Sequence, residues 1–149
     1  MRKNKVDIIS LGCSKNLVDS EHLIRQFQAC GYTVAHNPKR VDGEIVVVNT
    51  CGFIRDAQEE SINVILKLGQ AKKAGKLRKL IVMGCLSERF LDELKQELPE
   101  VDKFYGKFNW KQMLNDLGKS YHEDIANERY VSTPGHYAYL KIAEGCNRF

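Results

Sequence analysis

The five cysteines are the residues of this chain best suited to chemistry. They stand at positions 13, 30, 51, 85 and 146, with spacings of 17, 21, 34 and 61 residues, and none belongs to a Cys-x-x-Cys pair. These spacings argue against a disulfide framework, a zinc ribbon and a thioredoxin-type redox site. Because Asp7 interrupts the first apolar segment, we expect no signal peptide and a cytoplasmic chain with reduced thiols.

Three of the cysteines share one sequence context. Cys13, Cys51 and Cys85 each follow a β-prone apolar segment within three residues, and each precedes a helical pattern. The carboxyl ends of parallel strands meet at one edge of a sheet, so we expect the three thiols to converge there. Three converging thiolates can hold a 4Fe–4S cluster with one iron lacking a protein ligand, or a zinc ion with an open position.

Two further observations bear on this choice. Lys15 and Arg55 follow two of the cysteines closely, and cations there would offset the negative charge of an iron–sulfur cluster. Packing in the core without any metal is the alternative, because free cysteines are among the most buried residues. One cysteine fits that alternative well, whereas three in the same context favour a shared site. Cys30 ends a predicted helix and is expected only to pack.

The other polar residues show no catalytic pattern. The four histidines lack metal-ligand spacing and are expected at the surface. Asp19 and Glu21 are expected in the first turn of a helix, where the helix dipole favours carboxylates. The chain contains neither a G-x-G-x-x-G nor a Walker motif, so nucleotide binding has no motif behind it.

Strand-like and helical segments alternate through the first 117 residues. The apolar, β-prone segments are 6–11, 32–35, 45–48, 79–83 and 101–105, and the helical patterns are 17–30, 57–74, 87–96 and 110–117. Segment 45–48 is β-branched without alternation, which is typical of a parallel strand buried on both faces. The pattern predicts an α/β fold, an open parallel sheet with helices on both faces.

Length and composition suit one domain with additional segments. The chain has 149 residues, 43% of them hydrophobic and 28% charged. A net charge of +4 is too small to indicate nucleic-acid binding by itself, and the longest apolar runs are too short to span a membrane. We expect a domain over 1–117, a polar linker over 118–135 and the first strand of a second, truncated domain over 136–149.

Four motifs resemble the methylthiotransferase family. Segments 10–21, 48–54 and 83–89 resemble its N-terminal domain, and segment 138–148 resembles the entry into its radical S-adenosylmethionine (SAM) barrel. The motifs occur in the family's order and cover nearly the whole chain. Segment 12–21 is similar to the branch that modifies an aspartate of small-subunit ribosomal protein twelve. The tRNA-modifying branch usually has Gln-Met-Asn where this chain has Ser14-Lys15-Asn16.

The resemblance implies specific roles for four cysteines. Cys13, Cys51 and Cys85 match the ligands of the family's auxiliary 4Fe–4S cluster, which carries the sulfur. Cys146 matches the first ligand of the Cys-x-x-x-Cys-x-x-Cys motif that binds the second, SAM-binding 4Fe–4S cluster. The other two cysteines of that motif do not occur before Phe149, so we expect this chain alone not to turn over.

The implied activity of the full-length enzyme is addition of a methylthio group to the β-carbon of the ribosomal aspartate, with two 4Fe–4S clusters and SAM. The implied partner is the ribosomal protein; no membrane is involved, and RNA would be contacted only through the ribosome or a missing C-terminus. The electron donor is not indicated. Two alternatives stay open: a tRNA (adenosine) methylthiotransferase, and a stand-alone zinc-binding or interaction module.

Overall fold

The computed structural model describes residues 1–11, 14–50, 55–84, 86, 90–106 and 109–125. Its elements alternate as the sequence predicts. The strands are β1 (Arg2–Ser10), β2 (Thr33–His36), β3 (Gly43–Thr50), β4 (Lys79–Gly84) and β5 (Lys103–Tyr105). The helices are α1 (Ser14–Ala29), α2 (Arg55–Lys73), α4 (Leu91–Glu97) and α5 (Trp110–Asp116), with a short 3-10 helix at Glu123–Ile125.

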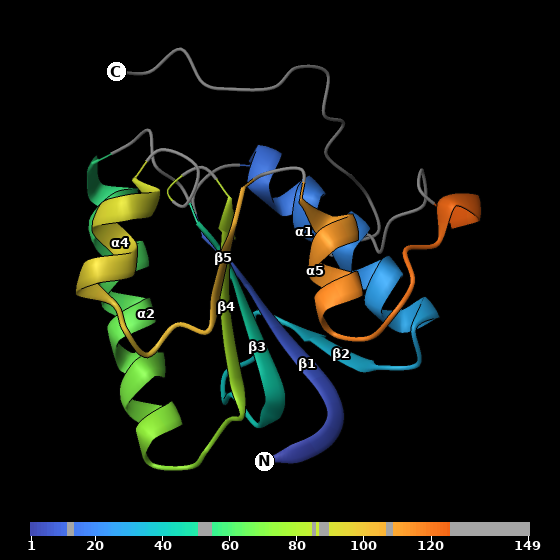
Figure 1. The fold of residues 1–149 in the computed structure, drawn as a ribbon, viewed down its shortest axis with the longest axis horizontal. Helices are drawn as coiled ribbons and strands as arrows, with labels where there is room; N and C mark the ends of the chain where they lie inside the picture. The colour runs from blue at the N-terminus through green and yellow to red at the C-terminus, as the bar shows by residue number, and fades with distance from the viewer. Residues whose placement is uncertain (12–13, 51–54, 85, 87–89, 107–108, 126–149) are drawn as a thin grey trace.

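The five strands form one parallel sheet in the order β2-β1-β3-β4-β5. Helices α1 and α5 cover one face, and α2 and α4 cover the other (Figure 1). Strand β3 lies at the centre, and its residues from Ile45 to Thr50 are all buried. A central parallel strand covered on both faces requires such a continuous apolar run. The predicted α/β fold with an open parallel sheet is therefore confirmed.

Each face of the sheet has its own apolar core. On the α1 face, Phe27 and Met113 are fully buried against β1, β3 and β4. On the α2 face, Ile65 and Leu94 pack against the opposite side chains of β3 and β4. Fully burying a side chain of this size contributes about 1.5–3 kcal/mol. These two cores fix the strands that precede the cysteines.

Helix α1 begins earlier than the sequence predicts. It starts at Ser14 instead of near Leu17, so Asp19 and Glu21 lie beyond its first turn. The prediction that they occupy the first turn is wrong. Both carboxylates face inward and are almost fully buried, with exposed fractions of 4% and 0%. The apolar pattern misses the helix start because residues 14–16, Ser-Lys-Asn, include no apolar residue.

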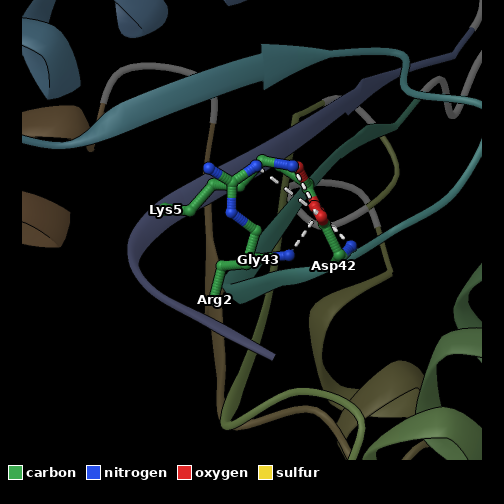
Figure 2. A network of polar contacts seen from close by, with 5 residues as sticks. Arg2, Lys5, Asp42 and Gly43 are labelled. Atoms are coloured by element: carbon green, nitrogen blue, oxygen red, sulfur yellow. Dashed lines mark hydrogen bonds and ion pairs between the residues drawn. The ribbon is translucent and has the colours of Figure 1, made fainter.

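A network of polar side chains lies at the amino-terminal end of β1 and β3, the end opposite to the one that leads into the cysteines (Figure 2). The buried Asp7 carboxylate accepts hydrogen bonds from the backbone N–H groups of Asp42 (2.8 Å) and Gly43 (2.7 Å). Lys5 pairs with Asp7 at 3.4 Å and also with Asp42, and it holds the pKa of the Asp42 carboxyl below its usual range. This network belongs to the amino-terminal end of β1 and β3, away from the cysteine-bearing edge.

The start of the expected linker packs against α1. The buried Gln26 side chain donates a hydrogen bond to the His122 carbonyl and accepts one from the His122 N–H, both at 2.9 Å. The Cys30 thiol donates to the Ser120 carbonyl at 3.4 Å. The domain boundary stays a prediction, and the expected strand after His136 lies outside the described residues. Among the helices that the structure describes, none is long and apolar enough to cross a membrane.

Candidate metal centre

The strands that precede three cysteines are neighbours and end in register. In the register of the sheet, Ser10 of β1 pairs with Asn49 of β3, and Thr50 of β3 pairs with Gly84 of β4. Adjacent strands lie about 5 Å apart, so the three ends share one short edge. Cys51 and Cys85 follow directly after β3 and β4, and Cys13 follows three residues after β1.

The thiols themselves are not placed. Cys13, Cys51, Cys85 and Cys146 lie outside the described residues, so their roles as ligands stay predictions. The side chains of Lys15 and Arg55 also fall outside what the structure describes. What the structure does show is that the chain segments leading into the first three cysteines converge.

Gly84 lets β4 approach β3 closely at this edge. Its φ of +100° is a conformation that other residues rarely adopt. A Cβ at this position would lie 2.7 Å from the carbonyl oxygen of Thr50 and closer still to Oδ1 of Asn49. The Thr50 hydroxyl also donates a 2.7 Å hydrogen bond to the Met83 carbonyl. The residue before Cys85 must therefore be glycine for the strand ends to meet as they do.

A layer of polar side chains lies beneath the edge, on the α1 face of the sheet. We call Ser10, Ser20, His36 and Asn49 the polar layer. The Ser10 hydroxyl donates to the Ser20 hydroxyl oxygen at 2.5 Å, and Asn49 Nδ2 donates to the same oxygen at 3.0 Å. His36 Nε2 lies 2.8 Å from Ser10 Oγ. Four elements, β1, α1, β2 and β3, thus meet through one hydrogen-bonded chain.

Sequence reasoning missed the polar layer. On the α1 face of β1, β2 and β3 the core side chains are apolar, and the last side chain of each strand on this face is Ser10, His36 or Asn49. The signal available was a strand whose alternate inward positions end on a polar residue. The polar layer also shows that the expectation of surface histidines does not describe His36 fully. His36 is only partly exposed, and it is hydrogen-bonded within this layer.

His36 is expected to make the stability of the chain depend on pH. Burial lowers its pKa, and the nearby Glu21 carboxylate only partly offsets this. The unfolded chain then binds more protons than the folded chain below the ordinary histidine pKa of about 6.5. The free energy of unfolding of the metal-free chain should therefore fall as pH decreases from 7 through this range.

His36→Gln removes the titration while keeping a hydrogen-bond donor for Ser10. Denaturant unfolding at several pH values between about 5 and 8 checks the prediction, with the other three histidines present in both proteins. We expect a smaller loss of stability on acidification in the variant than in the wild type. Identical pH dependence of the two proteins would contradict the account of His36.

The residues at this edge fit an iron–sulfur cluster. Three cysteines follow three neighbouring strand ends in the sequence, and Gly84 lets two of these ends, those of β3 and β4, approach closely. Helix α1 begins directly after Cys13, and α2 begins four residues after Cys51. The free N–H groups of helix N-termini favour anionic sulfur. Within the described ranges, no group of three or more His, Cys, Asp or Glu side chains is arranged to hold a metal ion.

Comparison with known proteins places the chain in a family. The model of the uncharacterized protein family UPF0004 matches residues 5–106, which run from β1 through β5. The chain belongs to this family. It is also 72% identical over 148 residues to the ribosomal protein uS12 methylthiotransferase RimO of Parabacteroides distasonis, an alignment that covers 99% of this chain and 34% of that protein.

Two further relatives carry the same name. The uS12 methylthiotransferases RimO of Porphyromonas gingivalis and Bacteroides thetaiotaomicron are 66% and 63% identical over 148 residues, again covering 99% of this chain and 34% of theirs. The chain thus spans about a third of the length of these relatives. The similarity to methylthiotransferases seen in the sequence motifs is confirmed.

Proposed function

We propose that this chain is the part of a ribosomal protein uS12 methylthiotransferase that holds an auxiliary 4Fe–4S cluster through Cys13, Cys51 and Cys85. The observation that carries the proposal is the shared edge where β1, β3 and β4 end, one strand leading into each of these cysteines. The names of three relatives at 63–72% identity support the substrate. They do not favour the tRNA alternative.

In this proposal the protein contributes ligands and shape. Cys13, Cys51 and Cys85 would hold the cluster through their thiolates, and the cluster would supply one iron without a protein ligand for chemistry with an external sulfur. Gly84 allows the ends of β3 and β4 to approach, and the helix starts supply N–H donors toward anionic sulfur. Cys146 is proposed as the first ligand of a second, SAM-binding cluster. A ribosomal substrate places the reaction in the cytoplasm.

The function is tested on the longer protein that contains this chain. Purified anaerobically and supplied with SAM, a chemical reductant and sulfide, it should add one methylthio group to an aspartate of ribosomal protein uS12. Mass spectrometry of the substrate detects the added group. Cys51→Ala should abolish the modification, and Cys30→Ala should retain it. Modification of tRNA but not of uS12 would overturn the proposal.

A further inference from the structure

The polar layer occupies a place where apolar side chains would be expected to pack. Ser20 and Asn49 are 0% and 1% exposed, and Phe27 and Val47 continue the same face as an apolar core. Burying polar groups costs free energy unless every group finds a partner. The hydrogen bonds of the polar layer provide these partners. Apolar side chains at the same positions would need no hydrogen bonds at all. The polar side chains therefore call for an explanation beyond packing.

Ser20 is the centre of the layer. Its hydroxyl oxygen accepts hydrogen bonds from Ser10 at the end of β1 and from Asn49 near the end of β3. Asn49 also lies against Gly84, because a Cβ on Gly84 would overlap its Oδ1. One helical hydroxyl thus sets the position of α1 relative to two strand ends, and Asn49 extends the contact to a third.

These three strand ends are the ones that lead into the proposed ligands. Asn49 stands two residues before Cys51, and Gly84 stands directly before Cys85. Ser20 lies on α1, the helix that begins immediately after Cys13. Hydrogen-bonded residues behind metal ligands orient those ligands, and their loss typically weakens metal binding about 10–100-fold. The polar layer thus includes or contacts residues of the strands and the helix that adjoin the three proposed ligands in the sequence.

We propose that Ser20 is a positioning residue, which through Ser10 and Asn49 holds the ends of β1, β3 and β4 at the spacing that the cluster requires. This inference rests on the proposed function, because it assumes that the cluster binds at this edge. Ser20 contacts Ser10 and Asn49, and would act on the cluster only through these strand ends. A site held in place before the cluster arrives spends less binding free energy on ordering its ligands.

Ser61 provides a matched control. It is a fully buried serine on α2, on the other face of the sheet, and its hydroxyl has no hydrogen-bond partner within the part of the chain that the structure describes. Ser20→Ala and Ser61→Ala each remove one buried helical hydroxyl. Only Ser20→Ala removes an acceptor shared by two strand ends. Ser10→Ala breaks one of these links at a less buried position and serves if Ser20→Ala fails to fold.

The experiment measures iron retention and stability separately. Each chain is reconstituted anaerobically with iron and sulfide, and the rate of iron release to a chelator is followed by absorbance. Thermal unfolding of the metal-free chains gives their stability. We expect release about tenfold faster from Ser20→Ala, an intermediate rate from Ser10→Ala, and a rate within about twofold of wild type from Ser61→Ala.

The outcomes separate this inference from the proposed function. If wild type, Ser20→Ala and Ser10→Ala release iron at the same rate while the variants melt at lower temperatures, the layer only stabilises the fold and the inference is overturned. In that case the proposed cluster site stands. If the wild-type chain takes up no iron at all, the proposed function fails and the inference fails with it.

Discussion

Replacing Gly84 by alanine is expected to lower the free energy of unfolding by about 3 kcal/mol. Two costs add together. The left-handed backbone at φ +100° costs a residue with a Cβ about 1–2 kcal/mol, and the new atom meets Thr50 and Asn49 at less than van der Waals distance. The contact cannot relax easily because Thr50 contributes backbone atoms of the buried central strand. Cluster binding should be lost with the close approach of β4 to β3.

Gly75→Ala separates the two costs. Gly75 has a φ of +77°, but nothing lies within 4 Å of the position its Cβ would take. This variant should lose only about 1 kcal/mol, from backbone strain alone. Denaturant unfolding of both metal-free variants gives the comparison, and iron uptake should be normal in Gly75→Ala. Equal destabilisation by the two substitutions would show that β3 and β4 do not meet closely at Gly84.

Removing any one of the three proposed ligands is expected to abolish stable cluster binding. Cys13→Ala, Cys51→Ala and Cys85→Ala each leave two thiolates, which are too few to hold a 4Fe–4S cluster whose remaining iron already lacks a protein ligand. After anaerobic reconstitution and desalting, each variant should keep less than about a quarter of the iron and lose the broad visible absorption of the wild type.

Cys30→Ala is the control for these variants and should keep the full iron content. Cys30 follows the end of α1, a helix of 16 residues and thus about 24 Å long that begins at the opposite, cysteine-bearing edge. Its thiol donates a hydrogen bond to Ser120, and burial raises its pKa, which favours the protonated form. Loss of iron from Cys30→Ala would contradict this account. A colourless wild type that binds zinc would support the zinc alternative.

The sequence predicts the sheet well because each strand is a short, strongly apolar segment that can be recognised from its own residues. The β-branched run from Ile45 to Val48 indicates a strand buried on both faces, and it is the central strand β3. The convergence of three strand ends follows from parallel strands alone. The sequence does not reveal the strand order, which makes β1, β3 and β4 immediate neighbours.

The polar layer was missed because a polar residue at the end of a strand resembles a loop residue in the sequence. In the sequence Ser10 and Asn49 stand at the ends of apolar runs, where serine and asparagine are commonly interpreted as the start of a turn. Only the register of β1 against β3 shows that both side chains lie on the same face, beneath Ser20 of α1. Asp19 and Glu21 on the same helix are also buried, which the sequence pattern did not indicate.

Iron and acid-labile sulfide per chain, measured after anaerobic reconstitution of the wild-type chain, test the central claim most directly. The account predicts about four irons and about four sulfides per chain, held by a site that three converging strand ends create. A chain that binds no iron under these conditions, or that binds iron without sulfide, would contradict it.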